Sequence, residues 1–495
     1  MRPPPILSRL ALVLAVPCLL ASTSDSPVPW PHGSPPTSDE LSALVTDALV
    51  IADRERYEGF LEAFEKGEDS EHIQLFQEDI DQNNYGYADL KRLFRFGDSF
   101  FEHAFRSEDG YGHSANPQLQ RIHSGVYGGR DTFSCSGCHS VGGTDGAGAE
   151  TQNAFLLGDG DHQSTANLRN APAVLGLGFV QALGVEMTFE IQAQRDGAVQ
   201  AAAVQGKAVS VALASKGISF GVVTANPDGS LDTSKLEGVD PDLVVKPFGW
   251  KGNVARLRRF AEDAARVHFG IQSDVLCQEY KEKPDTAKLG PGPNWYDPDD
   301  DGKYHEIMEG ILTASAVYMA QLESPVILPP NDSGLRDRWA HGSALFDQVG
   351  CGTCHVRSLQ LYQSSWSEYP DTTGGPPVTL NLITDGEQPR SLQVVNLFSD
   401  LKRHDMGKDL ADKVDDPAGL VPRSVFLTRP LWGLADSAPY MHDGRAATIP
   451  AAILAHGGDS QKSRDAFAAL SPDDQADLHV FLLSLTREPK PRVAR

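Results

Sequence analysis

The pattern Cys-x-x-Cys-His occurs twice in this chain, at residues 135–139 (CSGCH) and 351–355 (CGTCH). Two thiols at this spacing can form thioether bonds with the vinyl groups of a haem, and the following imidazole can ligate the iron. Four of the six cysteines of the chain lie in these two segments. The repeat therefore predicts two covalently attached c-type haems. The predicted attachment residues are Cys135, Cys138, Cys351 and Cys354, and the predicted proximal ligands are His139 and His355.

Two other chemistries also use paired cysteines. Two such pairs can form one four-cysteine zinc site, but Cys135 and Cys351 are 216 positions apart and zinc does not explain the repeated histidine. A thioredoxin-like redox pair needs a strand–turn–helix setting, which neither segment has. Haem attachment accounts for both the cysteines and the histidines. Cys277, outside both segments, is expected to be a small buried apolar side chain.

Length and charge narrow the classes of partner. The chain has 495 residues, enough for two or three domains, and a formal net charge of −24. The phosphates of a nucleic acid would repel such a chain, so we expect no nucleic-acid partner. The charge is compatible with a basic protein partner, such as a small electron carrier of the cytochrome or cupredoxin type.

The N-terminal residues 1–24 are typical of a secretory signal. Arg2 and Arg9 precede an apolar stretch at residues 10–21, and small residues follow. Twelve apolar residues are too few to span a bilayer, so no transmembrane anchor is expected. A proline-rich linker at 25–45 follows. The protein is expected to be periplasmic or secreted, which agrees with the haem motifs because c-type cytochromes are assembled outside the cytoplasm.

Helical patterns lead into both cysteine motifs. An apolar stripe at helical spacing runs from Leu90 to Phe101, and a second helical segment contains Gly342 and Phe346 and ends directly at Cys351. Their similarity suggests an internal repeat with a long loop in the first copy. The C-terminus predicts a helix with Ser471 as N-cap, whose apolar face is expected to pack across the second of these helices. The residues of that face are Leu478, Phe481, Leu482 and Leu485.

The predicted fold class is mainly α, with two cytochrome c-like haem domains at 46–325 and 326–495, long irregular loops and a small β insert near 195–245. Residues 203–235 alternate like strands and contain the turn sequence Asn226-Pro-Asp-Gly229. An amphipathic helix is predicted after Trp250, with Val254, Leu257, Ala261 and Ala264 on its apolar side.

An acidic stretch near 297–308 resembles the start of a calcium loop. Carboxylates alternate from Asp297 to Asp301 ahead of Gly302. The bidentate glutamate is missing, because Met308 takes the twelfth position. The stretch therefore predicts either a Ca²⁺ site or an acidic solvated turn.

Several further segments resemble the bacterial di-haem cytochrome c peroxidase/MauG superfamily, and most closely its branch of di-haem oxidoreductases, sometimes called thiol oxidoreductases. These segments occur in family order over roughly residues 85–490. They are CSGCHSVGG (135–143), RNAPAVLGLG (169–178), FGWKG (248–252), HDMG (404–407), TRPLWGL (428–434), PYMHDGR (439–445) and AHGG (455–458).

The resemblance implies a second axial ligand for each haem. Counting back eight positions from Asn170, as in the peroxidases, gives His162 for the first haem, although the loop is longer here. In relatives the residue fourteen places after the histidine of the His-Asp-Gly motif ligates the second iron, which gives His456. Met406 and Met441 are alternatives to His456. Histidine would lower the potential of that haem relative to methionine.

The resemblance also implies an activity. In the peroxidases electrons enter at the C-terminal haem and hydrogen peroxide is reduced at the N-terminal one, with a distal carboxylate that carries protons. Glu186 lies near that position, with Glu190 or a merely structural glutamate as alternatives. Two other functions stay open: a non-catalytic electron-transfer protein with two bis-histidine haems, and MauG-like or oxygenase oxidation of a larger substrate.

Overall fold

The computed structural model describes the chain in several stretches, which are residues 74–81, 87–111, 132–139, 153–157, 163–282, 302–303, 305–382, 392–415 and 421–487. The predicted signal (1–24), the linker (25–45), His162 and the acidic stretch Asp297–Asp301 lie outside the described residues. Within these stretches, no helix combines the length and the apolar character that crossing a membrane requires.

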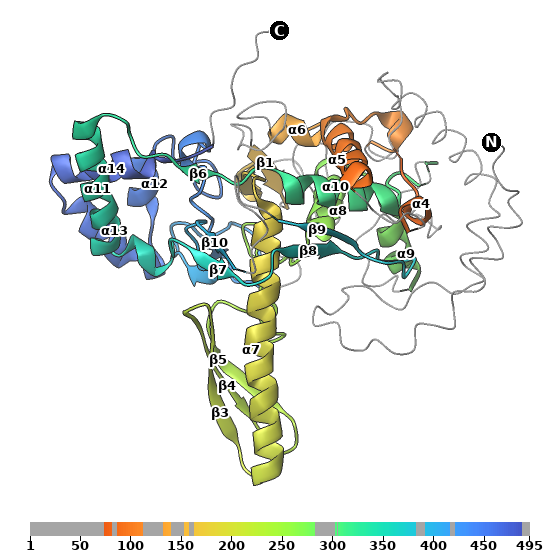
Figure 1. Cartoon of the computed structure of the whole chain (residues 1–495), viewed down its shortest axis with the longest axis horizontal. Coiled ribbons are helices and arrows are strands. Elements are labelled where there is room, and N and C mark those ends of the chain that lie inside the picture. Colours follow the sequence, from red (N-terminus) through yellow and green to blue (C-terminus); the bar gives the residue numbers. More distant parts are fainter. Residues whose placement is uncertain are drawn as a thin grey trace, which may run out of the picture.

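The described part is mainly helical, as predicted, with small antiparallel sheets (Figure 1). The helices are α4 (Gln77–Asp81), α5 (Tyr87–Glu102), α6 (Cys135–Cys138), α7 (Leu177–Gln205), α8 (Leu257–His268), α9 (Asp274–Glu282), α10 (Glu309–Gln321), α11 (Ser333–Gln348), α12 (Ile449–Ala455), α13 (Gln461–Ala468) and α14 (Pro472–Leu482). The strands are β1 (Asn153–Leu156), β2 (Asn167–Asn170), β3 (Val209–Ser215), β4 (Ile218–Ala225), β5 (Leu231–Leu236), β6 (Val326–Ile327), β7 (Leu359–Leu361), β8 (Ser365–Glu368), β9 (Val378–Asn381), β10 (Gln393–Val395), β11 (Arg403–Asp405), β12 (Val425–Leu427) and β13 (Leu485–Thr486).

A close helix crossing lies ahead of the first cysteine motif. Helix α5 packs against α10, whose residues from Glu309 to Ala320 are all buried. At Gly97 a side chain would collide with the carbonyl oxygen of Ala314 on α10. Glycine is needed here because only its missing Cβ lets the two backbones approach this closely. Phe101, one helical turn later, is buried beside them.

The same arrangement recurs ahead of the second motif. Helix α11 crosses α14 at Gly342, where a Cβ would collide with the backbone of Asp477. Phe346, again four residues after the glycine, is fully buried. The predicted N-cap of α14 is confirmed, since the Ser471 hydroxyl accepts a hydrogen bond from the backbone N–H of Asp474 at 3.1 Å. Two helix pairs, each crossing at a glycine, thus precede the two Cys-x-x-Cys-His segments.

The predicted β insert is larger than a hairpin. Strands β3, β4 and β5 form a three-stranded antiparallel sheet that packs against the long helix α7, and together they form an arm that projects from the body (Figure 1). The predicted turn at Asn226–Gly229 joins β4 to β5, with Gly229 at φ 85°. The alternation of the third strand, β5, is weaker because half of its residues are exposed and none is fully buried.

The predicted amphipathic helix is present as α8, and Val254 and Leu257 are buried as predicted, but the rest of the buried face differs from the expected one. Ala261 and Ala264 are only partly buried, whereas Arg258 and Glu262 are fully buried. Apolar spacing could not reveal these charges because their partners come from distant parts of the chain. The Arg258 guanidinium donates to the Glu368 carboxylate at 2.8 Å, and Glu309 lies 3.6 Å away.

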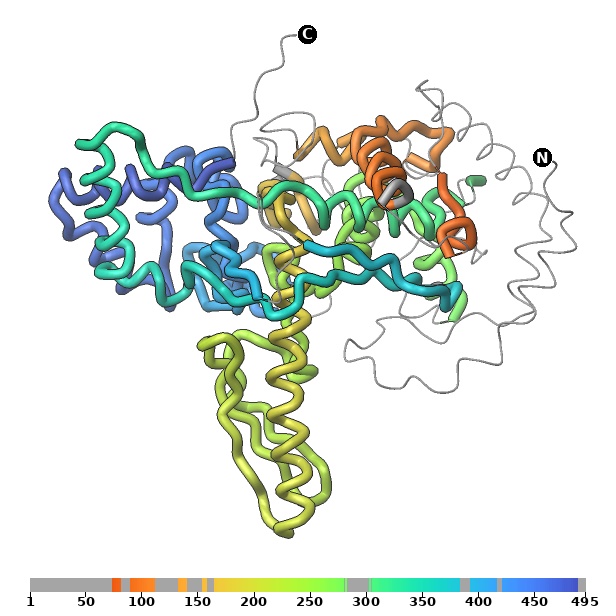
Figure 2. The backbone as a smooth tube through the Cα atoms, in the orientation of Figure 1, coloured from red at the N-terminus to blue at the C-terminus, as the bar shows by residue number. Residues whose placement is uncertain are grey.

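Two hydrophobic cores organise the described residues. The larger core combines α5, α7, α8 and α10 with side chains from the C-terminal half, among them Trp366 of β8 and Leu380 of β9. Cys277 is buried, as predicted. The smaller core lies within α11 to α14, which form a separate lobe in Figure 2. Residues of both cores line the site described next.

Candidate functional site

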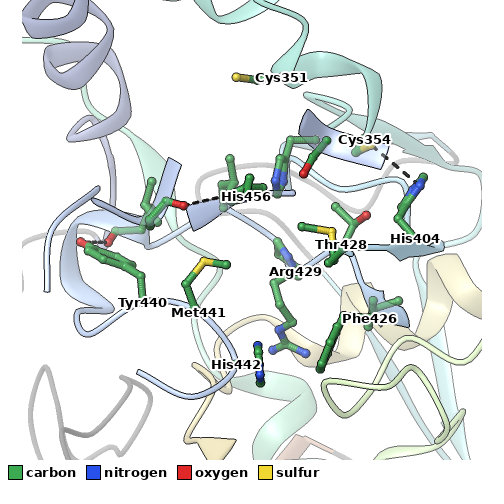
Figure 3. A pocket seen from close by; sticks show the side chains of 18 of the residues that line it. Cys351, Cys354, His404, Phe426, Thr428, Arg429, Tyr440, Met441, His442 and His456 are labelled. Carbon is green, nitrogen blue, oxygen red and sulfur yellow. Dashed lines mark hydrogen bonds between the residues drawn. The ribbon is translucent and has the colours of Figure 1, made fainter. Parts of the chain in front are cut away.

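A cavity of about 470 Å³ lies between the lobe of α11–α14 and the larger core (Figure 3). Seven separate segments converge on it, and all of them were singled out in the sequence. They contribute Asn170–Ala173, Phe248 and Trp250, Cys351–His355, His404 and Met406, Thr428–Leu434, Pro439–His442, and His456. The volume lies in the ordinary range for a cofactor site.

Two imidazoles face each other across this cavity. His355 Nδ1 lies 3.1 Å from the Phe398 carbonyl oxygen, and His456 Nδ1 lies 2.8 Å from the Ala452 carbonyl oxygen. A hydrogen bond from Nδ1 to a backbone carbonyl fixes the tautomer of a metal-binding histidine and directs Nε2 to the metal. The ring centroids are 6.5 Å apart. Metal–imidazole bonds of about 2 Å on opposite sides of one ion require a spacing of about 6–6.5 Å.

Withdrawal from water keeps both rings neutral. Burial lowers the pKa of His355 to about 4, and it also lowers the pKa of His456. Neutral imidazole is the form that ligates iron. The donor set, its orientation and its spacing therefore fit an iron held between His355 and His456.

The two cysteines of the second motif border the same cavity. Gly350, at φ 89°, ends α11 and turns the chain into Cys351. Cys351 and Cys354 form no disulfide with each other, and burial raises the pKa of the Cys351 thiol to about 11. Both sulfurs are thus placed to form thioether bonds to a porphyrin within reach of His355.

His404 sits beside Cys354 and is held by a carboxylate. Its Nε2 lies 2.7 Å from Asp400, and its Nδ1 lies 4.0 Å from the sulfur of Cys354. Burial by itself lowers the pKa of His404, but the hydrogen bonds to Asp400 and Cys354 outweigh burial and raise it to about 10. His404 is therefore held by Asp400 at the edge of the cavity.

The far wall of the cavity comes from the N-terminal half. The indole N–H of Trp250 donates to the Asn170 carbonyl at 2.8 Å, and the Asn170 N–H donates to the His442 carbonyl at 2.7 Å. The His442 ring stacks on Phe426 with centroids 4.3 Å apart, and burial lowers its pKa to about 4. These bonds connect the RNAPAVLG, FGWKG and PYMHDGR segments into one wall.

The arginine of the TRPLWGL segment also lines this wall. In Figure 3 Arg429 lies between His456 and His442. Its guanidinium carbon is 5.4 Å from the centroid of the Trp250 ring. Burial lowers the pKa of Arg429 to about 10, and it is the one cause of that shift. Nothing in its sequence neighbourhood distinguishes this residue from the other arginines.

The first motif lies near this wall but is described less fully. Ser134 caps the short helix α6, since its hydroxyl accepts from the Gly137 N–H at 3.0 Å. His139 follows, 6.0 Å from the ring of Phe101. Burial lowers the pKa of His139 to about 4, helped by the charges of His268 and Arg429. Its Nδ1 is buried and has no hydrogen-bond partner among the described residues.

The carboxylate predicted for proton transfer lies at the base of the arm. Glu186 on α7 pairs with Lys216 at 2.5 Å and accepts backbone N–H bonds from Tyr362 and Gln363 at 2.8–3.1 Å. Glu190 accepts from the Ser215 hydroxyl at 2.6 Å. Glu186 and Glu190 do not line the cavity, and their catalytic role stays a prediction.

Comparison with known proteins decides the family. Residues 161–485 match the family described as "Di-haem oxidoreductase, putative peroxidase". The chain belongs to this family. The match covers about two thirds of the chain, includes the second cysteine motif and confirms the resemblance drawn from the sequence segments. Haem cofactors and the oxidoreductase class follow from this membership.

Solved structures are similar only in outline. The hydrazine synthase of Kuenenia stuttgartiensis, pressurised with xenon, matches at 15% identity and a TM-score of 0.35, over 82% of this chain and 94% of its own. A MauG-like protein associated with microbial copper homeostasis matches at 15% identity and a TM-score of 0.28, over 80% and 89%. Among curated proteins nothing matches. These TM-scores support no argument about activity.

Proposed function

We propose that this protein is an exported di-haem c-type oxidoreductase that reduces hydrogen peroxide, or a related small oxidant, with electrons from a small carrier protein. A haem bound at each motif supplies one-electron redox chemistry. Electrons enter at the C-terminal site around His355, and the oxidant is reduced at the N-terminal site around His139. Reduction of one peroxide to water consumes two electrons and two protons, which suits a chain with two redox centres.

The opposed pair of His355 and His456 is the observation that carries this proposal. Two imidazoles, each fixed at Nδ1 by a backbone carbonyl, could together hold one iron. Such a site has no position for a substrate and suits electron transfer. The chemistry with the oxidant is therefore assigned to the other motif.

The division into two haem domains, at 46–325 and 326–495, belongs to the same proposal. Support comes from the repeated helix crossing, in which Gly97 meets α10 and Gly342 meets α14 ahead of the two motifs. Residues 1–24 are proposed to export the chain, and Asp297–Asp301 to hold Ca²⁺. Sensitivity of the folded protein to a calcium chelator tests the latter.

The N-terminal site must open to its oxidant. His162 is the proposed second ligand of that site and the one that leaves, and Glu186 is its proposed proton carrier, with Glu190 as the alternative. Replacing His162 with glycine should then produce a high-spin spectrum before any reduction. An unaltered spectrum rejects His162 as a ligand.

The visible spectrum of the half-reduced protein tests the function. We expect a high-spin signal to appear when the first electron is added, and this signal should disappear on addition of hydrogen peroxide. A spectrum that stays low-spin and does not respond to peroxide removes the peroxidase proposal. The second candidate then remains, which is an electron-transfer protein with two closed bis-histidine haems. The His355–His456 pair is compatible with this candidate as well.

A further inference from the structure

Arg429 has no anionic partner among the described residues, whereas Arg169 and Arg258 each have one. Arg169 forms two bonds of 2.7 Å to Asp412, and Arg258 bonds to Glu368 at 2.8 Å. For Arg429, no hydrogen bond or ion pair to a described residue is present, and its environment contributes burial alone to its pKa. The nearest aromatic contact is the face of Trp250, at 5.4 Å.

Arg429 is partly buried, and a guanidinium largely withdrawn from water without a counter-charge is unfavourable. Removing a cation from water costs several kcal/mol, at an order of magnitude, unless an anion offsets the loss. A pKa of about 10 still leaves Arg429 protonated at neutral pH. Because its side chain lines the cavity, the compensating anion has to come from what fills that cavity.

We propose that Arg429 binds a carboxylate inside the cavity, and this inference rests on the proposed function. Arginine presents parallel N–H donors that match the two oxygens of a carboxylate. Two sources could supply that group: a propionate of the haem held by Cys351, Cys354 and His355, or a small carboxylate from solution. The walls favour the first source, since the same cavity contains the attachment cysteines and Arg429.

Arg429 would then be a positioning residue that also sets the redox properties of the site. A guanidinium that neutralises a propionate lowers the negative charge near the iron and favours its reduced form. Its loss should make that haem harder to reduce.

Spectroscopic redox titration of the di-haem protein tests the proposal. In Arg429→Gln, we expect the equilibrium for reducing one of the two haems to shift by about tenfold towards the oxidised form. Arg429→Lys should recover most of this shift, because the charge is restored without the paired donors. Arg423→Gln, which removes an exposed guanidinium paired with Asp415, should match the wild type.

Titration with sodium formate separates the two sources. No response of the wild type, with a shift in Arg429→Gln, identifies the haem propionate. A saturable response of the wild type that Arg429→Gln abolishes identifies a carboxylate from solution. If Arg429→Gln loses one haem, retention of both haems by Arg429→Lys supports the charge pairing, whereas loss in both variants overturns it.

Unchanged titrations of Arg429→Gln, with both haems attached and no effect of formate, also overturn the proposal. Failure of the proposed function is a different result. In that case the half-reduced wild-type protein would stay low-spin and would not respond to hydrogen peroxide, while the redox titrations of the variants would still report on Arg429.

Discussion

Arg258 and Arg429 are both withdrawn from water, but they occupy opposite kinds of environment. Arg258 lies in a closed network in which Glu368, Asp371 and Glu309 surround it at 2.8–3.6 Å. Burial alone would lower its pKa, but these carboxylates raise it above the usual range. Around Arg429 burial acts alone and lowers the pKa to about 10.

We infer from this difference that Arg258 stabilises the fold and that Arg429 serves to bind a ligand. The network of Arg258 is satisfied by the chain and joins α8 and α10 to the segment of β8 from the C-terminal half. The charge of Arg429 is not balanced by a described residue. Arg429 lines the same cavity as Cys351, His355 and His456. Four sets of substitutions test this difference between the two environments.

The largest effect is expected at the cavity. Replacing both Cys351 and Cys354 with serine should remove one covalent haem of the two, because no thiol remains to form a thioether there. The measurement is the haem-to-protein ratio of the exported protein after denaturation. The matched variant, with Cys135 and Cys138 replaced, should lose the other haem. If both variants keep two haems, the assignment of the motifs is wrong.

Breaking the closed network should destabilise the protein without removing haem. Arg258→Met leaves Glu309 without its guanidinium partner and leaves Glu368 and Asp371 paired with Arg256 alone, which costs about 3 kcal/mol. Denaturant unfolding of the haem-loaded protein measures this loss. The exposed pair Arg423–Asp415 provides the control, since Arg423→Gln should leave stability unchanged. Equal stability of all three proteins would contradict the role given to the network.

The pH dependence of stability should report on Glu309 within that network. Burial raises the pKa of Glu309 to about 7, above the value of 4.5 expected in the unfolded chain. A raised folded pKa stabilises the protein fully below pH 4.5, and this contribution is lost as the pH rises through 7. It amounts to about 3 kcal/mol between these limits.

Glu309→Gln should therefore flatten the stability profile between pH 5 and 8 in urea unfolding experiments. Glu237→Gln, which changes an exposed carboxylate of the arm, should keep the wild-type profile. The same slope in Glu309→Gln and in the wild type would show that Glu309 is not the group responsible.

The smallest effects concern the helix crossings beside the two regions. Gly97→Ala and Gly342→Ala should each cost about 1–3 kcal/mol, because the added methyl group meets a backbone that must move. Gly197→Ala in α7 is the control: no atom lies within 4 Å, and alanine should stabilise that helix by up to about 1 kcal/mol. Thermal unfolding separates the three. A destabilised Gly197→Ala would show that helix propensity does not decide these effects.

Local sequence patterns predicted many features of the structure. The mainly helical fold, the N-cap Ser471, the turn at Asn226–Gly229 and the burial of Cys277 were all predictable, because each depends on neighbouring residues. The segments of the cavity were also recognisable one by one. Their convergence on a single space was implied by the family order alone.

Partners distant in the chain could not be predicted. Apolar spacing placed Ala261 and Ala264 on the buried face of α8, whereas the structure buries Arg258 because Glu368, 110 residues away, pairs with it. Arg429 stood in a recognised segment, but its lack of a carboxylate partner is visible only when the neighbours are in place. Both features depend on tertiary pairing and leave no periodic trace in the sequence.

Intact-mass measurement of the exported protein tests whether two haems are covalently attached. The measured mass is compared with the polypeptide mass after removal of the signal. We expect the measured mass to exceed the polypeptide mass by two covalently bound haems, and this excess should persist in acidified organic solvent. A mass equal to that of the bare polypeptide would contradict it.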